Sequence, residues 1–319
     1  MVLQEPKFSC QFVIEVCWFG ILQTHLQLIV RPGLTQFIPV DIRSRLISIE
    51  IQSHPISCRA TGYSDRRSHP FAKNLRFTIG YNYLDAQDAA SIDAEISSDA
   101  YDRNPANIQH TNTPVLAPSL YGNKHRIVGS LYKRFNYNSW ATHIALFAEY
   151  VQGGRFSYTY SGDINNDGSG LNDLLYIPTD GEIDQMQFAG DASAQRAALK
   201  AYIDQDDYLS ENRGSYAEKY ATLNPWYSRW DLRLIQEYVL ANKNSIQLSI
   251  DILNVGNLLN SSWGVRQSAT NTGLVQPIGV SVTDGIPTYS FDVSQKETFF
   301  NDFGLNSRWQ AQVGLRYSF

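Results

Sequence analysis

The last thirteen residues of the chain constrain its fold more than any other stretch. In SRWQAQVGLRYSF (307–319), every second side chain is apolar and those between are polar or small. The apolar positions are Trp309, Ala311, Val313, Leu315, Tyr317 and Phe319. Because alternate side chains of an extended strand point to opposite faces, this segment predicts a strand with one apolar and one polar face.

Two features of this strand favour lipid as the surroundings of its apolar face. Aromatic residues lie near both ends of that face, and the sequence ends on Phe319. Roughly 9–11 alternating residues with aromatic residues at both interfaces are typical of a transmembrane β-barrel strand. The alternative is a terminal strand of a soluble sheet, because period-two alternation occurs in both settings.

Composition narrows the possible classes of protein. Aromatic residues make up 13% of the 319 residues, mainly as 19 Tyr and 15 Phe, whereas charged residues make up 18%. The net charge of -5 and the lack of clustered Lys and Arg argue against a nucleic-acid partner. No run approaches the roughly 18 apolar residues of a membrane-spanning helix. A barrel strand needs an apolar side chain only at alternate positions, so a membrane barrel is compatible with this composition.

Further segments repeat the alternation of the C-terminal strand. We predict strands over 75–84, 125–135, 141–151, 226–239 and 244–253, and a hairpin of 276–282 with 287–292 around Asp284-Gly285. Gly153-Gly154 predicts a tight hairpin turn into a strand over 155–160. The total is about eight or nine strands, with no helix long enough to belong to a core.

Two long polar segments interrupt the strands, over 85–123 and 161–225. Segments of this length are unusual in a compact domain and indicate functional loops. Outer-membrane barrels carry long loops at one end and short turns at the other. Within the second segment, residues 192–203 are rich in helix formers and follow Asp191, a plausible N-cap, so we expect a short surface helix there.

The second loop contains a possible calcium site. In DINNDGSGLND, Asp163, Asn165 and Asp167 occupy the first, third and fifth positions of an EF-hand-like loop, and Gly168 the sixth. Leu174 stands at the twelfth position, where a bidentate carboxylate is required, although Asp173 precedes it. The segment therefore predicts either a Ca²⁺ site of Asp163, Asn165, Asp167 and Asp173, or a turn cluster rich in Asx and Gly.

Residues 1–73 differ in residue pattern from the rest of the chain. They hold all three cysteines, Cys10, Cys17 and Cys58, in no metal-binding spacing, and they lack a recognisable signal peptide. Short strands are possible over 36–42 and 46–51. We therefore predict an atypical segment over 1–73, not native to the domain behind it, and a second region, 74–319, that forms the barrel.

Residues 71–319 resemble the C-terminal part of a TonB-dependent outer-membrane receptor with large loops. The resemblance is carried in order by YSGDINNDGSGLNDLLYIPTD, ENRGSYAEKYATLNPWYSRWDLRLIQEY, SIQLSIDILNVGNLLNSSWG and RWQAQVGLRYSF. It implies an antiparallel transmembrane β-barrel of about 22 strands, a plug domain ahead of the barrel, and energised uptake of a scarce nutrient.

The resemblance also implies a location and partners. The chain would lie in the cell outer membrane, in contact with its lipid, as a C-terminal fragment of about eight strands. Trp309, Val313, Leu315, Tyr317 and Phe319 would form the terminal signal read by the barrel-assembly machinery. No plug domain or energy-coupling box is recognisable, so contact with the TonB complex would require a missing N-terminal part. We therefore expect a truncated receptor that is inactive alone.

Other functions stay open on the sequence alone. The six histidines, His25, His54, His69, His110, His125 and His143, are scattered, and no HExxH or GxSxG motif is present. We expect loop or lumen residues in a protein without enzymatic activity. A barrel enzyme, such as an outer-membrane protease or phospholipase, stays an alternative because its catalytic residues would come from different loops. A passive porin or adhesin barrel of about eight strands is one alternative. A soluble, Ca²⁺-dependent glycan-binding β-sandwich is another. The sequence does not single out residues that bind a transported ligand.

Overall fold

The chain was analysed as a computed structural model that describes residues 46–53, 56–72, 74–89, 91, 95–106, 115–240, 244–269 and 273–319. Of residues 46–72 only the backbone is described. The chain divides into two compact units, 1–44 and 45–319, and the described residues belong to the second. The structure is mostly β, with 49% strand and 17% helix. The strand predicted over 36–42 and His110 lie outside the described residues.

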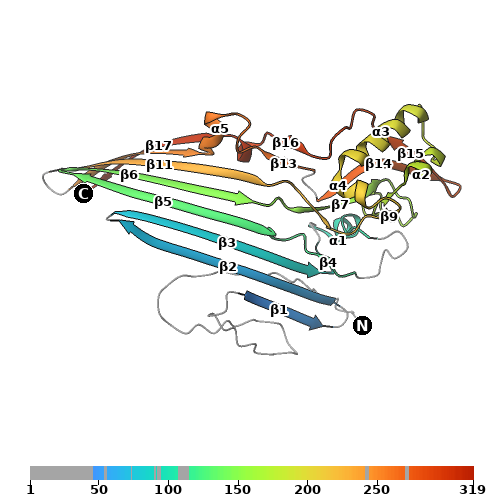
Figure 1. Cartoon of the computed structure of the whole chain (residues 1–319), viewed down its shortest axis with the longest axis horizontal. Coiled ribbons are helices and arrows are strands. Elements are labelled where there is room, and N and C mark those ends of the chain that lie inside the picture. The colour runs from blue at the N-terminus through green and yellow to red at the C-terminus, as the bar shows by residue number, and fades with distance from the viewer. Residues whose placement is uncertain are drawn as a thin grey trace, which may run out of the picture. The chain divides into compact units, whose positions relative to one another are not determined.

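A large antiparallel sheet, curled like half a barrel, forms most of the described structure (Figure 1). Its strand order is β1-β2-β3-β5-β6-β11-β12-β17, and the short β4 pairs with the end of β3. The strands are β1 (Leu46–Ser53), β2 (Ile56–Ala72), β3 (Leu75–Asp88), β4 (Ala117–Pro118), β5 (His125–Tyr137), β6 (Trp140–Val151), β11 (Tyr227–Val239), β12 (Ser245–Leu253) and β17 (Gln310–Ser318).

The two ends of this sheet differ in how the strands are connected. At one end, where the C-terminus lies, the strands of each of the pairs β2–β3, β5–β6 and β11–β12 follow one another closely in the sequence. Asn138, in the two-residue turn between β5 and β6, has a positive φ of 50°, which asparagine adopts more readily than most residues. At the other end, residues 89–124, 152–226 and 254–309 leave the sheet as long excursions.

The excursions fold together into a head at that end of the sheet (Figure 1). A four-stranded sheet of order β10-β7-β14-β15 lies at its centre. It consists of β7 (Arg155–Ser161), β10 (Thr222–Leu223), β14 (Leu274–Thr283) and β15 (Ile286–Phe291). Strand β7 runs parallel to β14, so the second and third excursions share one sheet. The Asp284-Gly285 turn has φ values of 51° and 76°, the left-handed pair that a tight hairpin requires.

Helices cover the central sheet of the head, and local capping fixes where they begin. The helices are α2 (Asp180–Gln185), α3 (Ala192–Gln205) and α4 (Asp207–Glu211). The Asp191 carboxylate accepts hydrogen bonds from the backbone N–H groups of Ser193 and Ala194, both at 3.1 Å. Thr179 and Glu182 form a capping box at the start of α2. Such caps satisfy donors that the first turn of a helix leaves unpaired.

The buried hydrophobic core lies in the head. It joins β7, β14 and β15 to the helices, with Leu199, Tyr202 and Ile203 of α3 almost fully buried. The other buried members are Phe156, Tyr158, Tyr160, Leu175, Ile177, Ile183, Leu209, Ala217, Val275, Ile278, Val280 and Phe291. None of the described helices is long and apolar enough to cross a membrane.

The first excursion docks onto the head through polar contacts. The N–H of Leu174 donates to the carbonyl of Ala106 at 3.0 Å, and the Tyr220 hydroxyl donates to the Ser91 carbonyl at 3.0 Å. The smaller elements are α1 (Ser97–Asp102), β8 (Tyr176–Ile177), β9 (Ser215–Tyr216), α5 (Val255–Leu259), β13 (Arg266–Ser268), β16 (Phe300–Asp302) and the 3₁₀ turn η1 (Leu305–Ser307), of which α5 and β13 lie beside β11 of the large sheet (Figure 1). Two small ladders join β8 to β9 and β13 to β16.

The structure confirms the strands predicted from alternation and the helix predicted after Asp191. The prediction that no helix belongs to a core is wrong, because α3 contributes three of its side chains to the buried core. The hairpin predicted at Gly153-Gly154 is also wrong. Strand β6 is bonded to β5 on one edge and to β11 on the other as far as Val151, so β7 cannot fold back on it and pairs within the head.

The head core yields a prediction about stability. We expect Leu199→Ala to lower the free energy of opening of the head by about 2–5 kcal/mol, because it removes a fully buried side chain and leaves a cavity. Ile286→Ala, at an exposed position of the same head, should change it by less than about 0.5 kcal/mol. Hydrogen exchange of the amides of β7 and β14 measures both values, and equal effects would contradict the assignment of the core.

Candidate functional site

The large sheet has one apolar face, and its pairing register builds that face across six strands. Ile250 lies opposite Leu234 on β11 and opposite Val313 on β17, and Leu146 lies opposite both Leu131 and Leu232. Paired residues of an antiparallel ladder share a face. The apolar side chains therefore form a continuous band from β3 to β17. Members that are large and exposed include Ile79, Leu131, Ile144, Leu248, Ile250, Val313 and Leu315.

Aromatic side chains border this apolar band at both ends. At the end with short connections, the rings of Trp140 and Tyr238 lie 4.5 Å apart. At the head end, Tyr150 and Trp226 stack at 4.6 Å, and Trp226 in turn stacks on His125 at 5.8 Å. The exposed aromatic residues of the two rows are Phe135, Tyr137, Trp140 and Tyr317 at one end, and Tyr81, Tyr150, Trp226, Trp230 and Trp309 at the other.

The apolar band stops at β3. The register of β2 places Asp65, Arg67 and His69 opposite Tyr81, Ile79 and Phe77. In β1 the apolar residues Ile47, Ile49 and Ile51 pair with Gly62, Ala60 and Cys58 of β2. Along β2, these even-numbered positions alternate with the odd-numbered positions that pair with the apolar residues of β3. The pattern of β1 and β2 is thus out of phase with that of the six strands that follow.

The opposite face of the sheet is polar and lines a hollow. Ion pairs cross it between neighbouring positions, from Arg126 to Glu149 at 2.7 Å and from Arg233 to Asp251 at 3.2 Å. A hollow of about 680 Å³ lies against this face. Its lining residues are Ser130, Tyr132, Ala145, Phe147, Asp231, Arg233, Asp251, Leu253, Gln310 and Gln312 of the polar face, together with Leu131, Leu146, Leu232 and Ala311 of the apolar positions. The curled sheet therefore has its polar side chains around the hollow and its apolar band on the outside.

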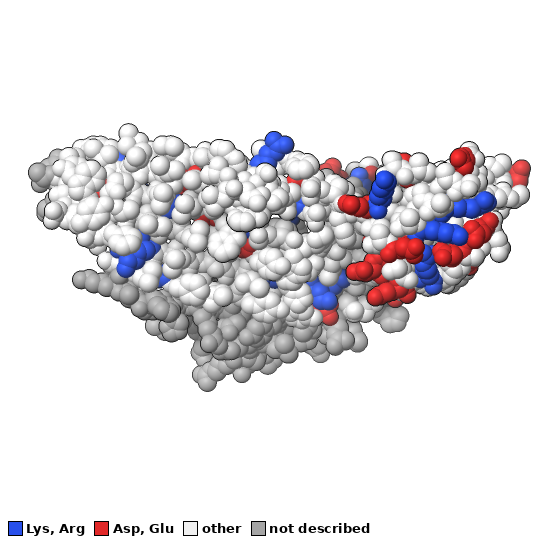
Figure 2. All heavy atoms as spheres, turned by 45° about the horizontal axis from the view of Figure 1, so that its top comes forward, with Lys and Arg blue, Asp and Glu red and all other residues white. Residues whose placement is uncertain are grey.

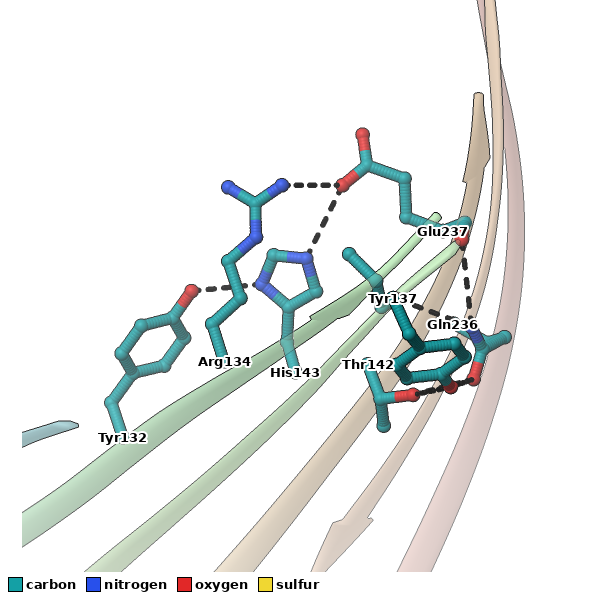
Figure 3. Close-up of polar contacts among 8 residues, drawn as sticks. Tyr132, Arg134, Tyr137, Thr142, His143, Gln236 and Glu237 are labelled. Carbon is teal, nitrogen blue, oxygen red and sulfur yellow. Dashed lines mark hydrogen bonds and ion pairs between the residues drawn. The ribbon is translucent and has the colours of Figure 1, made fainter. Parts of the chain in front are cut away.

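A cluster of Tyr132, Arg134, His143 and Glu237 stands out on the polar face (Figure 3). The Tyr132 hydroxyl and His143 Nδ1 are 2.8 Å apart, and His143 Nε2 lies 3.3 Å from a carboxylate oxygen of Glu237. Arg134 reaches the same oxygen at 3.5 Å. Its Nε is buried without a hydrogen-bond partner among the described residues. The cluster can hold charged groups in fixed positions and can bind a polar ligand or protein segment.

A second polar cluster in Figure 3 lies on the other face, close to the short connections. The Thr142 hydroxyl donates to the side-chain carbonyl of Gln236 at 2.8 Å and lies 2.5 Å from the Tyr137 hydroxyl. These polar groups satisfy one another at the level of the aromatic row. Tyrosine suits such a border because it has an apolar ring and a polar tip.

The five residues of the predicted assembly signal share one face at an edge of the sheet. Trp309 directly precedes β17, Phe319 directly follows it, and Val313, Leu315 and Tyr317 lie between them. All five are exposed, and Leu315 retains 76% of its accessible surface. Among the described residues, β17 pairs only with β12.

The four predicted calcium ligands come together in one loop of the head, where they bind backbone N–H groups. Asp163 accepts hydrogen bonds from the N–H groups of Asp167 at 3.1 Å and Gly168 at 2.9 Å. The side-chain oxygen of Asn165 accepts a second bond from the Asp167 N–H at 2.9 Å, and Asp173 accepts one from Ile164 at 3.1 Å. This is the bonding of an Asx-rich turn.

Within the described part of the chain, no group of three or more His, Cys, Asp and Glu side chains is arranged to hold a metal ion. The calcium site stays a prediction. Burial, reinforced by the nearby Asp167 and Asp163 carboxylates, raises the pKa of Asp173 to about 6. A cation that neutralised this loop would favour the ionised form of Asp173.

Two of the six histidines have described side chains, and they lie on opposite faces of the sheet. His143 belongs to the polar-face cluster, and its assignment to a lumen stays a prediction. His125 begins β5 at the head end of the apolar band, where its Nδ1 lies 2.8 Å from the Tyr81 hydroxyl. Tyr132, Arg134 and Glu237 were not predicted as site residues, because their only sequence signal is the polar position that each holds in an alternating strand.

Comparison of the chain with models of protein families, with curated proteins and with solved structures finds no match.

The buried carboxyl of Asp173 makes the stability of the head pH-dependent. Its pKa is about 6 in the folded head against 3.8 ordinarily, so the folded state binds more protons between these pH values. The free energy of unfolding of the head therefore falls by up to roughly 3 kcal/mol as the pH rises from about 4 to above 6. We expect Asp173→Asn to remove this fall, as measured by hydrogen exchange of the head at several pH values. If the stability of the variant head depends on pH as strongly as that of the wild type, Asp173 is not the group responsible.

Calcium binding is testable on the same loop. If the loop binds Ca²⁺, addition of Ca²⁺ at pH 7.5 should slow hydrogen exchange of residues 163–173 in the wild type. The effect should be lost in Asp163→Ala with Asp167→Ala, which removes two carboxylates. Mg²⁺ at equal concentration is the control for ionic strength. Equal exchange with and without Ca²⁺ in the wild type would leave the loop as a turn cluster.

Proposed function

We propose that the chain forms the C-terminal part of the β-barrel of an outer-membrane receptor, of the class that imports a scarce nutrient with energy delivered through TonB. The observation that carries this proposal is the apolar band, which is exposed, spans six strands and is bordered by aromatic residues at both ends. Exposed apolar surfaces of this size mark contact with lipid or with another protein.

The length of the band supports lipid as the contact. On β6, Trp140 and Tyr150 are ten residues apart, which is roughly 33 Å along an extended strand. A strand tilted by about 40° covers roughly 25 Å of membrane over that length, close to the height of the apolar band of known barrels. Figure 2 shows charged side chains gathered over the head, whereas much of the visible sheet is free of them.

The head supports a receptor in preference to a passive pore. Its excursions share a buried core and a common sheet, so they offer a preorganised surface outside the proposed membrane. Loops held on a rigid scaffold are where binding residues concentrate, and preorganisation lowers the entropy lost on binding. The polar hollow behind the band would form part of the barrel interior.

The proposal assigns partners to three regions. Outer-membrane lipid would surround the apolar band, and the barrel-assembly machinery would recognise Trp309, Val313, Leu315, Tyr317 and Phe319. A complete wall needs strands beyond the described sheet, because an unpaired strand edge in hydrocarbon costs several kcal/mol per backbone group. The TonB complex would act through a plug and coupling segment in an N-terminal part.

The phase change at β2 supports the prediction that residues 1–73 are foreign to the barrel. An Arg on the lipid face near the middle of the membrane costs about 2–4 kcal/mol, and Arg67 holds the position opposite Ile79. We propose that in the working barrel another strand, with apolar residues in phase with Phe77, Ile79 and Tyr81, pairs with β3.

Lipid contact is tested with paired spin labels at neighbouring positions. In a background with Cys10, Cys17 and Cys58 replaced by serine, Leu248→Cys labels the apolar face and Gln247→Cys the polar face. In outer-membrane preparations, we expect the label at 248 to be more accessible to oxygen than to a water-soluble nickel complex, and the label at 247 to show the reverse. Equal accessibility at both positions, or a chain found only in the aqueous fraction, contradicts the proposal.

A further inference from the structure

A second hollow, of about 390 Å³, lies in the third excursion, and we call it the head pocket. Its volume falls within the range of about 300–1,000 Å³ that is common for small-molecule sites. Two of its eight lining residues are phenylalanines. The other six are polar, namely Gln267, Ser294, Gln295, Lys296, Glu297 and Asn301. The head pocket is therefore lined mainly by groups that form hydrogen bonds.

The lining segment 294–301 is fixed to the core of the head. Thr298, within this segment, is buried and donates a hydrogen bond to the Asp206 carboxylate at 2.8 Å. The ring of Phe299 packs edge to face on Phe156, with 6.0 Å between the ring centres. These two contacts hold the segment in place before a ligand binds, and preorganisation of this kind lowers the entropy lost on binding.

The β13–β16 ladder brings two amide side chains to the head pocket. Gln267 of β13 pairs with Asn301 of β16, and the Gln267 side-chain N–H donates to the Asn301 side-chain carbonyl at 3.1 Å. Both side chains are exposed. A side-chain amide has two N–H donors and a carbonyl that accepts two hydrogen bonds. Each of these amides can therefore form further hydrogen bonds with a ligand.

The lining of the head pocket carries no net charge. Lys296 and Glu297 follow one another along the chain, both are exposed, and neither forms an ion pair with another described residue. Their opposite charges balance, whereas recognition of an ionic ligand is favoured by an excess of the opposite charge. The remaining polar lining groups are three amides and one hydroxyl. The lining therefore favours an uncharged ligand.

Among uncharged ligands, a carbohydrate matches this lining better than a peptide does. Every hydroxyl of a sugar both donates and accepts hydrogen bonds, as amide and hydroxyl side chains do, and charged side chains form stronger hydrogen bonds than neutral ones. Peptide sites depend on strand addition or on apolar grooves and pockets for side chains. The head pocket is lined mainly by polar residues, and the ring of Phe299 is engaged with the core.

We propose that the head pocket is a carbohydrate-binding subsite and that the nutrient bound by the head is a neutral glycan. The inference rests on the proposed function, because it names the class of nutrient that the receptor takes. Gln267 and Asn301 bind ligand hydroxyls through their amides. Lys296 and Glu297 bind them through their charged groups, on the segment that Thr298 fixes to the core.

The experiment measures ligand binding to the full chain in detergent micelles by saturation-transfer NMR. The neutral probes are maltotriose, cellotriose and xylotriose, and citrate and tri-alanine represent anions and peptides. Gln267→Ala combined with Asn301→Ala removes two amides from the head pocket, and Glu297→Gln removes one charge with little change of shape. The matched control is Gln185→Ala, which removes an exposed amide of α2 outside the pocket.

We expect at least one of the three sugars to bind the wild type. Its Kd should rise about tenfold or more in the double variant, because two hydrogen-bonding groups are lost, and several-fold in Glu297→Gln. Gln185→Ala should bind as the wild type does. Hydrogen exchange of the β7 and β14 amides shows whether the head of each variant is folded, and if the double variant unfolds, Glu297→Gln decides.

The inference fails if none of the three sugars binds the wild type, or if the folded pocket variants bind as tightly as the control. It also fails if citrate or tri-alanine binds the head pocket more tightly than the sugars do. The spin label at Leu248→Cys tests the proposed function separately. A label in lipid without sugar binding overturns this inference alone, whereas sugar binding with the label in water overturns the proposed function and leaves the carbohydrate site.

Discussion

The antiparallel pairing register is the constraint on which the rest of the structure depends. From β3 to β17, each strand places its apolar residues opposite those of its neighbours, so that one face of the sheet is apolar and the other polar. A slip of one residue in any ladder would turn that strand's apolar side chains to the opposite face. The band, the polar hollow and the two aromatic rows all form because the apolar positions of neighbouring strands lie opposite one another.

The protein divides its hydrophobic residues between two different environments. In the head, they are buried against one another under helices, as in any water-soluble domain. In the large sheet, they are exposed on the outer face, and the ion pairs are on the inner face. Lipid around the outer face, as we propose, would make the second arrangement favourable.

Local features of the fold could be predicted because their physical causes are local. Period-two alternation located the strands of the large sheet, Asp191 marked the start of α3, and Asp284-Gly285 marked a hairpin. The partner of β7 could not be predicted, because Gly153-Gly154 has the composition of a hairpin turn and only the occupied edges of β6 prevent one. The contribution of α3 to a core depends on side chains from β14 and β15, far along the chain.

The candidate sites show the same limit. The residues of the calcium-like loop lie close in sequence, so their proximity was foreseeable, but their bonds to backbone N–H groups were not. The cluster of Tyr132, His143 and Glu237 comes from three strands. In the sequence, each of these residues is one polar residue among several in an alternating segment. They meet only because the three strands pair in a particular register, and the sequence of one strand does not determine that register.

The parallel pairing of β7 with β14 has a consequence for the order in which the chain folds. Ser157 pairs with Leu274, and the loop that this contact closes contains β11 and β12. The entropy lost in closing a loop grows with its flexible length, and the β11–β12 hairpin shortens that length once it has formed. A β11–β12 hairpin that forms first therefore lowers the entropic cost of closing the head by roughly a few tenths of a kcal/mol.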